Sequence, residues 1–291
     1  MSRESAWDAA EVIAGRVLQE KGVAKFPVDP MAIAQACEIS VQAKPARKPG
    51  VSGMLLRVGD AFTIVYATDI NSLGFQRFSV AHELGHYFLP GHVDAIFSDT
   101  GVHESRAGFR TSDRFEIEAD HFAAALLMPA WLFRDALRTA GEGMVAVERL
   151  AAQCSTSLTA TAIRFAQFNH DPVAVIMSSG ESIDYCFMSP PLRELDGIDW
   201  IRKRDRLPVT SETRRLNADR ERLQRVRRVR SNSNMQDWFG GGRSVEVVED
   251  VVYLGAYGKT LTVLHSFELP EEEDEEAENQ LVESWTPRFR R

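Results

Sequence analysis

The chain has 291 residues and a formal net charge of −8; 44% of its residues are hydrophobic and 26% are charged. This composition predicts a soluble globular protein of two or three domains and excludes a protein that coats nucleic acid with its whole surface. No apolar run approaches the ~18 residues of a membrane helix, and the N-terminus lacks a signal-peptide pattern, so we expect a cytoplasmic protein with no membrane partner. The three cysteines, Cys37, Cys154 and Cys186, lie far apart and indicate reduced thiols.

The N-terminal part predicts two helices, a short strand and a hairpin. Apolar residues recur at helical spacing over residues 6–18. Asp29-Pro30 is typical of a helix start, with aspartate as the cap and proline in the first turn. Residues 39–41 predict a strand. Segments 53–58 and 62–66 flank a short glycine-containing turn, which predicts a β-hairpin.

The next predicted helix, residues 72–89, carries the HExxH pattern His82-Glu83-Leu84-Gly85-His86. Residues four apart share one helix face, so His82 and His86 can hold one cation, and Glu83 can reach a water that the cation activates. Gly85 costs ~1 kcal/mol relative to alanine inside a helix, which indicates that another element packs close to it. The same pentapeptide also occurs by chance in helices that bind no metal.

A zinc-type site needs a third protein ligand, and the sequence offers two. His92 gives the outer spacing of HExxHxxGxxH, but Leu89 stands where that pattern needs glycine. Glu116 begins a predicted helix, and Asp120 lies four residues later on the same flank. One of these carboxylates could ligate the metal while the other accepts a hydrogen bond from a ligating imidazole. Asp113 and Glu116 also resemble a helix-capping pair, so the residues alone leave the third ligand open.

Two blocks of sequence together resemble the ImmA/IrrE family of metallopeptidases. The first reads Phe-Ser-Val-Ala-His-Glu-Leu-Gly-His-Tyr over residues 78–87, and the second, residues 116–129, ends in Leu-Leu-Met-Pro. The resemblance implies a gluzincin-like fold with Glu116 as third ligand. It also implies a substrate that is a helix-turn-helix repressor of the XRE type. The likeness runs over residues 9–168 and more faintly to residue 267.

The segment 91–112 departs from the family pattern by its length. It has no clear period and contains three glycines. Loops of this length are uncommon unless they are functional or mobile, so we expect the segment to border the active-site cleft. Within it we interpret His103 as a solvent-facing loop histidine.

The segments 131–138 and 147–165 predict further helices. The second segment contains two short helices with a turn between them, which suits a helix-turn-helix core. Its second helix offers Thr159, Thr161 and Arg164 for reading bases but few other suitable groups. We therefore favour packing or partner docking over DNA reading for this region.

From Pro172 onward the pattern changes to strands. Apolar, β-branched runs predict five strands, at residues 173–177, 183–187, 245–249, 251–254 and 260–264. The family resemblance implies a GAF-like α+β domain here, and no ligand motif is visible.

Charge in this part is unevenly distributed. Residues 202–230 contain twelve Lys/Arg and four Asp/Glu, a net charge of +8, without interleaved aromatics. Such a stretch could bind nucleic acid or an acidic partner, although solvated arginine-rich helices are common. The acidic run 271–276 predicts a disordered tail.

The sequence thus predicts an α+β fold in four parts. These are a gluzincin-like metallopeptidase domain, a helix-turn-helix-like helical region, a GAF-like domain and an acidic tail, at residues 1–130, 131–169, 170–268 and 269–291.

We interpret the chain as a metal-dependent, site-specific endopeptidase. The predicted roles are metal binding by His82, His86 and Glu116, general-base catalysis by Glu83, and support of a ligating histidine by Asp120. One divalent ion is expected, zinc by default, with manganese or iron(II) compatible with the same donors. The family implies cleavage of a repressor in a stress or mobile-element response. The alternative is a DNA- or partner-binding transcriptional regulator that uses the metallopeptidase fold as a scaffold.

Overall fold

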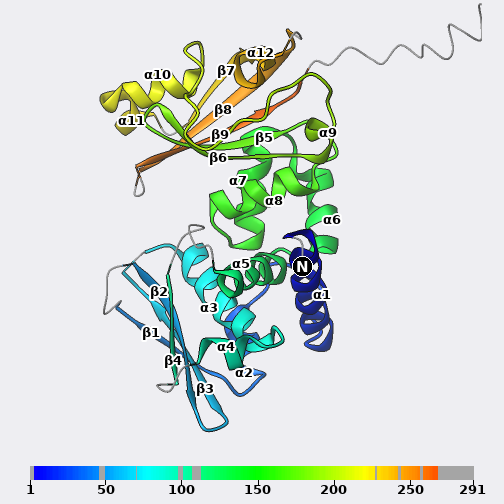
Figure 1. Cartoon of the computed structure of the whole chain (residues 1–291), viewed down its shortest axis with the longest axis vertical. Coiled ribbons are helices and arrows are strands. Elements are labelled where there is room, and N and C mark those ends of the chain that lie inside the picture. The colour runs from blue at the N-terminus through cyan, green and yellow to red at the C-terminus, as the bar shows by residue number, and fades with distance from the viewer. Residues whose placement is uncertain are drawn as a thin grey trace, which may run out of the picture.

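The computed structural model describes residues 3–45, 50–69, 71–97, 101–106, 113–226, 228–241, 244–255 and 258–267. Within them the chain forms an α+β fold, as predicted, with a four-stranded sheet, a five-stranded sheet and helices between the two (Figure 1). Among these residues, no helix is long and apolar enough to cross a membrane. The predicted acidic tail lies outside the described residues.

The first sheet has the strand order β1-β3-β2-β4. Its strands are β1 (Ser40–Lys44), β2 (Val51–Val58), β3 (Ala61–Ala67) and β4 (Val102–Arg106). β2 and β3 pair antiparallel, which confirms the predicted hairpin, and β1 pairs parallel to β3. β4 pairs antiparallel with β2 and forms one edge of the sheet. The segment 91–112 is therefore not a continuous loop, because it contains β4 and a short helix.

Five helices accompany this sheet: α1 (Arg3–Glu20), α2 (Pro30–Gln35), α3 (Leu73–Phe88), α4 (His92–Ile96) and α5 (Arg114–Leu127). The predicted cap of α2 is confirmed, because the carboxylate of Asp29 accepts a hydrogen bond from the amide of Met31 at 3.0 Å. Ala10, Ala14 and Val17 give α1 a buried face within the main apolar cluster. Helix α3 packs against α5 and against the strands β2 and β3, and α5 also packs against α1 (Figure 1).

The helical region contains α6 (Ala130–Ala140), α7 (Gly143–Cys154) and α8 (Leu158–Phe168). In α8 the guanidinium of Arg164 donates two hydrogen bonds, at 3.0 and 2.8 Å, to the carbonyl of Met128, which ends α5. Arg164 also forms an ion pair with Glu11 of α1. Both Thr161 and Arg164 are buried, so they cannot read bases from these positions. The region instead fixes the end of α5.

The second sheet is antiparallel throughout, with the order β6-β5-β9-β8-β7. Its strands are β5 (Ala174–Ser179), β6 (Ser182–Met188), β7 (Arg228–Asn234), β8 (Glu246–Leu254) and β9 (Lys259–His265). The predicted strands at 245–249 and 251–254 are one strand, because the β8 ladder runs unbroken past Asp250. β7 was not predicted, since its Arg, Ser and Asn side chains lack the apolar alternation of a strand.

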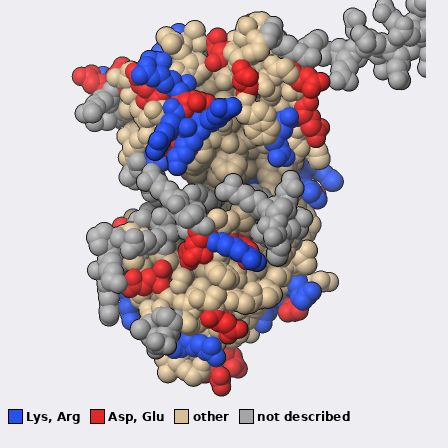
Figure 2. Space-filling model, viewed as in Figure 1, with Lys and Arg blue, Asp and Glu red and all other residues tan. Residues whose placement is uncertain are grey.

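The outer helices are α9 (Pro190–Arg193), α10 (Glu212–Ala218), α11 (Arg220–Arg225) and α12 (Met235–Phe239). Much of the basic stretch 202–230 forms ion pairs with carboxylates here. The pairs are Arg214–Glu181, Arg215–Glu212, Arg222–Glu212, Arg225–Glu221, Arg228–Glu148, Arg228–Asp250 and Arg230–Asp250. Figure 2 accordingly shows basic and acidic side chains intermingled on the upper part of the visible face.

The two faces of the second sheet join different apolar clusters. On β5, Val175 and Met177 belong to the main cluster, which continues from α1, α3 and α5 through α7 and α8. Ala174 and Ile176 point to the opposite face and belong to a second cluster that includes Phe239 of α12. The helical region therefore shares its core with the C-terminal sheet. The boundaries proposed between domains remain predictions.

A buried polar junction accompanies this shared core. The carboxylate of Asp250 on β8 accepts hydrogen bonds from the amide of Met144 at 3.0 Å and from Arg230 at 2.8 Å. His265 of β9 lies 3.1 Å from the same carboxylate. Gly143 has φ of 56°, and a Cβ there would lie 2.6 Å from Asp250 Oδ2. The start of α7 is therefore seated directly on the sheet.

Candidate metal centre

Helix α3 places its two motif histidines on one face. The helix begins after Ser72, whose hydroxyl accepts a hydrogen bond from the amide of Phe75 at 3.4 Å. The side chains of His82 and His86 are buried, and their Nε2 atoms lie 3.1 Å apart. The four-residue spacing thus brings the two ring nitrogens to one point.

Helix α5 brings Glu116 to that point. The two helices approach closely at Gly85: a Cβ there would lie 3.0 Å from Ala119 Cα, tighter than nearly all real contacts of a Cβ atom. The carboxylate of Glu116 lies 3.4 Å from His82 Nε2 and 3.3 Å from His86 Nε2. The close neighbour that the sequence indicated for Gly85 is therefore α5.

Three donor atoms, one each from His82, His86 and Glu116, lie within 4.8 Å of one another. Two imidazole nitrogens and one carboxylate oxygen are a donor set that suits zinc and related divalent ions. The residues present therefore fit the metal that the HExxH pattern predicted, with nitrogen and oxygen donors in reach of a single ion.

The Nδ1 atoms of both motif histidines are occupied by other side chains. His82 Nδ1 lies 2.9 Å from Asp120 Oδ1, the contact expected for a residue that supports a ligating imidazole. His86 Nδ1 lies 3.1 Å from Nδ1 of His92. Both rings therefore present Nε2 towards Glu116.

His92 is not one of the three metal-binding residues but links His86 to Glu118. The ring is fully buried on α4, and its Nε2 lies 3.1 Å from Glu118 Oε2. Glu118 also accepts a hydrogen bond from Arg114 Nε at 2.5 Å. This chain is satisfied when His86 donates its Nδ1 proton to His92 and His92 donates its Nε2 proton to Glu118. His86 Nε2 then keeps its lone pair.

His103 is the residue that sequence reasoning missed. It lies on β4 rather than in a loop, and its Nε2 is 3.0 Å from Glu116 Oε1. The ring centres of His103 and His86 are 4.5 Å apart. The sequence signal for a strand here was weak, since Val102 favours strands but Glu104 does not. Its contact with Glu116 depends on the pairing of β4 with β2, which the sequence did not predict.

Glu83 lies beside this group in an unusual state. The side chain is fully buried, and within the described residues neither carboxylate oxygen has a hydrogen-bond partner. Burial raises the pKa of Glu83 to about 7, against the opposing effects of His82 and of Ser105, whose hydroxyl is near but not in hydrogen-bond geometry. A Cβ on Gly53 of β2 would lie 2.5 Å from Glu83 Oε1, so the strand leaves room for this carboxylate only because residue 53 is glycine.

The other charges of the centre follow from the same contacts. Burial alone would lower the pKa of His82, but Asp120 and Glu116 outweigh it and raise the value to about 10. Burial lowers the pKa of His86 to about 3, against the effect of Glu116, so its imidazole is neutral. Burial opposes ionisation of Glu116, but the neighbouring imidazoles of His103 and His82, with His86 beside them, hold its pKa well below the ordinary range. The centre thus combines an ionised carboxylate with a neutral imidazole, both of which can ligate a cation.

Comparison with known proteins gives a consistent result for this part of the chain. Residues 34–166 match the model of the Peptidase M78 family, described as the IrrE N-terminal-like domain. The radiation response metalloprotease IrrE of Deinococcus deserti is 37% identical over 98 residues, 34% of this chain and 34% of that protein. The protein of the same name from Deinococcus radiodurans is 35% identical over 101 residues, 35% of this chain and 29% of its own length. The match thus spans about a third of these relatives.

A solved structure resembles nearly the whole chain. It is a Mycobacterium tuberculosis transcriptional regulator with a TM-score of 0.55 and 17% sequence identity; the alignment covers 91% of this chain and 82% of that one. At this identity the likeness concerns the fold alone.

Proposed function

Because residues 34–166 belong to the ImmA/IrrE family of metallopeptidases, we propose that the chain is a metal-dependent endopeptidase. In this proposal His82, His86 and Glu116 hold one divalent ion. Zinc is the metal we expect from two imidazoles and a carboxylate, and manganese or iron(II) accept the same donors.

The observation that carries the proposal is the state of Glu83. A buried carboxylate without a hydrogen-bond partner is costly, by about 1–3 kcal/mol or more for a charged group. A scaffold that only held a metal would gain nothing from it. Next to three metal-binding donors, the same carboxylate is suited to take a proton.

The steps of peptide hydrolysis then divide among the residues of the metal centre. When bound, the divalent ion supplies a Lewis acid that polarises the scissile carbonyl and lowers the pKa of water. Glu83 takes the proton of the attacking water and passes it to the leaving amine. Asp120 and His92 hold the rings of His82 and His86 in their ligating orientation.

We further propose that the substrate is a helix-turn-helix repressor of the XRE type, cleaved in a stress response. Support comes from the family resemblance and from the name of the two Deinococcus relatives, radiation response metalloprotease. A scissile amide cannot reach the metal from inside a helix, so the substrate must enter extended. β4 is an edge strand and carries His103 beside Glu116, so an extended segment that pairs with β4 would pass the centre.

The test is incubation of the full chain with a candidate repressor, with and without a chelator. We expect one main cut, loss of DNA binding by the repressor, no cleavage after chelation, and little action on casein. His82→Ala, His86→Ala and Glu116→Ala should each remove most bound metal. Efficient digestion of casein would contradict the specificity, and cleavage that survives complete metal removal would contradict the mechanism.

The alternative function is a regulator that binds DNA or a partner through the helical region and the basic stretch. The fold-level likeness to a transcriptional regulator is the observation in its favour. Against it, Arg164 is buried and most arginines of residues 214–230 are ion-paired. Salt-dependent, nanomolar DNA binding without proteolysis would favour this alternative.

A further inference from the structure

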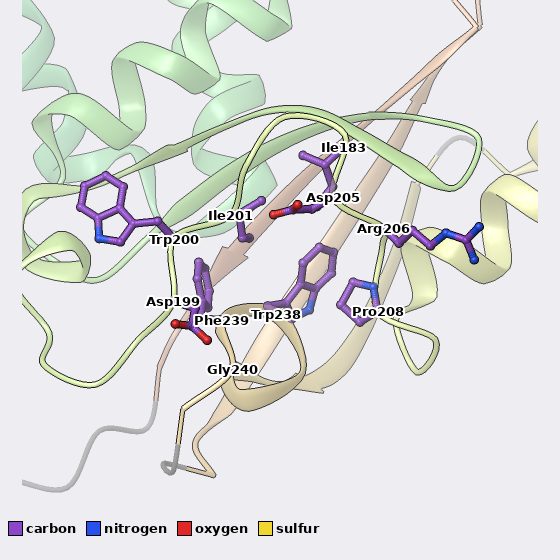
Figure 3. Close-up of a pocket in the computed structure, with 10 residues that line it drawn as sticks. All are labelled: Ile183, Asp199, Trp200, Ile201, Asp205, Arg206, Pro208, Trp238, Phe239 and Gly240. Carbon is purple, nitrogen blue, oxygen red and sulfur yellow. The ribbon is translucent and has the colours of Figure 1, made fainter.

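A pocket in the C-terminal part of the molecule and strand β4 at the metal centre both carry side chains without an assigned role. The pocket has a volume of about 220 Å³ and lies between β6, the segment 199–208 and the end of α12 (Figure 3). The rings of Trp238 and Phe239 in its lining are only 6% and 1% exposed, so they present little surface to a ligand. Strand β4 carries the stronger signal.

Strand β4 turns one face towards the metal centre. In its antiparallel pairing with β2, His103 lies opposite Leu55 and Ser105 lies opposite Gly53. Leu55 is fully buried in the main apolar cluster, and a Cβ on Gly53 would meet Glu83. Residues two apart in a strand share one face, so His103 and Ser105 both face the helix that carries the HExxH pattern.

The ring of His103 contacts one oxygen of the Glu116 carboxylate. Its Nε2 lies 3.0 Å from Glu116 Oε1, and each of the two side chains is 16% exposed. His86 Nε2 lies 3.3 Å from the same oxygen. The other oxygen, Oε2, lies 3.4 Å from His82 Nε2. The two oxygens of this carboxylate therefore have different neighbours, and His103 lies on the side of Oε1.

The hydrogen bond between these two side chains runs from His103 to Glu116. The pKa of Glu116 lies well below the ordinary range, so its carboxylate is ionised and can only accept. The ring of His103 must then carry a proton on Nε2, which is true of one neutral tautomer and of the cation alike. The contact therefore does not depend on which of these two states the ring adopts.

His103 is not itself one of the metal-binding donors. Among the described residues, the donor atoms that lie within 4.8 Å of one another belong to the two motif histidines and Glu116. Each motif histidine has a supporting side chain, from Asp120 at 2.9 Å and from His92 at 3.1 Å. His103 provides the corresponding contact for Glu116. Each metal-binding residue is therefore held by a side chain from another element of the fold.

We propose that His103 is a positioning residue that holds Oε1 of Glu116 and leaves Oε2 as the oxygen for the cation. This inference rests on the proposed metal centre. A carboxylate can bind a cation through one oxygen or through both, and a catalytic zinc site keeps one position open beside three protein ligands. If both oxygens of Glu116 bound the cation, the second would occupy a position that water needs. A hydrogen bond to Oε1 favours binding through one oxygen.

The experiment compares two side chains of similar length at position 103 in the full chain. Glutamine can donate a hydrogen bond from its amide, whereas methionine has no donor. Cobalt(II) is the probe, because its visible absorption is stronger in a four-coordinate site than in a five-coordinate one. In His103→Met we expect the absorption per bound cobalt to fall, since Glu116 can then bind through both oxygens. In His103→Gln it should stay near the wild-type value.

The affinity for cobalt gives a second measurement on the same variants. Competition with a chromophoric chelator should show about tenfold weaker binding in His103→Met, because the carboxylate is no longer held towards the motif histidines. His103→Gln should recover part of this loss. Val102→Ala is the control, since Val102 is 40% exposed and is the neighbour of His103 on β4, and it should match the wild type in both measurements.

An unchanged cobalt spectrum in His103→Met would overturn the proposal, and so would equal changes in His103→Met and His103→Gln. A loss of bound cobalt in His103→Met as complete as in Glu116→Ala would make His103 a ligand and overturn it too. None of these measurements uses a substrate. A chain that gives the expected cobalt results but cleaves no repressor would therefore contradict the proposed endopeptidase and leave the role of His103 in place, whereas a wild type that takes up no cobalt would overturn both.

Discussion

Glu83 and Asp250 are both fully buried carboxylates, one in the metal centre and one at the junction with the C-terminal sheet. Each lies against a glycine that has no room for a side chain. A Cβ on Gly53 would lie 2.5 Å from Glu83 Oε1, and one on Gly143 would lie 2.6 Å from Asp250 Oδ2. The two sites are therefore built alike at the level of backbone and burial.

The two carboxylates differ in their hydrogen bonds. Asp250 accepts from Met144, Arg230 and His265, and these contacts hold its pKa well below the ordinary value although burial alone would raise it. Within the described residues Glu83 accepts none, and burial raises its pKa to about 7. A satisfied buried carboxylate stabilises the fold, whereas an unsatisfied one costs stability and marks a site where chemistry needs it.

The largest effect that separates the two should come from Glu83→Gln. The amide keeps the shape but cannot take a proton, so we expect repressor cleavage to fall by about 10³-fold. Metal content should stay at the wild-type level, and the free energy of unfolding should not fall, since a buried charge is removed. Cleavage near the wild-type rate would show that Glu83 is not the base.

Asp250→Ala should give the opposite pattern. It leaves Arg230 and His265 without their buried partner, so we expect the free energy of unfolding to fall by about 3–5 kcal/mol. Metal content, measured well below the melting temperature, should be unchanged. Urea unfolding measures the effect, with Glu246→Ala, an exposed position on the same strand, as the control. A loss no larger than that of the control would remove Asp250 from its structural role.

Replacing His92, which supports the ligand His86, should have an intermediate effect, seen in the affinity for the metal. We expect His92→Phe to weaken metal binding by about 10–100-fold, because His86 loses the acceptor for its Nδ1 proton. His92→Gln should recover part of the affinity, since an amide can both accept from His86 and donate to Glu118. Competition with a chromophoric chelator measures both. Complete loss of metal in His92→Phe, equal to that of His86→Ala, would instead make His92 a ligand.

Substitutions of Gly53 and Gly143, which lie against Glu83 and Asp250, test the difference between the two carboxylates directly. Overpacking a fixed site costs about 1–3 kcal/mol. In Gly143→Ala we expect that cost in the free energy of unfolding, because the new Cβ meets His265 and Asp250 and φ is positive. In Gly53→Ala the new Cβ meets Glu83, so kcat should fall more than stability does. Equal effects of both variants on kcat would contradict the division of roles.

The sequence predicted the metal centre around Glu83 but not the buried junction around Asp250. HExxH fixes three residues by local helical spacing, and the cost of glycine in a helix indicated that some element packs against Gly85, although not which one. The contact of His103 with Glu116 was missed because it depends on β4 pairing with β2 across a long segment. Asp250 was missed for the same reason, since its partners come from α7, β7 and β9.

Residue spacing left the third metal ligand open between His92 and Glu116, and the family resemblance favoured Glu116. The predicted strands of the second sheet were largely confirmed, but the charged strand β7 was not predicted. The sequence left its arginines open between binding a nucleic acid or acidic partner and lying in solvent, whereas Arg228 and Arg230 pair with Asp250. A charge run therefore says little until the carboxylates that face it are known.

The smallest effects concern pH, measured on metal-free protein. Asp250 has a folded pKa below its ordinary value of 3.8, so its contribution to stability is present above that value and is lost as pH falls below it. The difference in unfolding free energy between the wild type and Asp250→Asn should therefore shrink by up to about 1.4 kcal/mol per pH unit below pH ~4. A difference that stays constant down to low pH would contradict the assigned contacts.

Glu83 should show the reverse dependence in a different window. Its folded pKa of about 7 lies above its ordinary value of 4.5, so the folded state binds the extra proton between these values. The stabilisation that this proton provides is therefore full below pH ~4.5. It is lost as pH rises towards pH ~7, by up to about 1.4 kcal/mol per pH unit. The slope should appear in the difference between the unfolding free energies of the wild type and Glu83→Gln, because His82 and His86 titrate in both proteins, and the acid limb of Asp250 should be the same in both. Urea unfolding of the wild type and both variants across the two windows tests whether the buried carboxylates differ in their partners, as the structure describes.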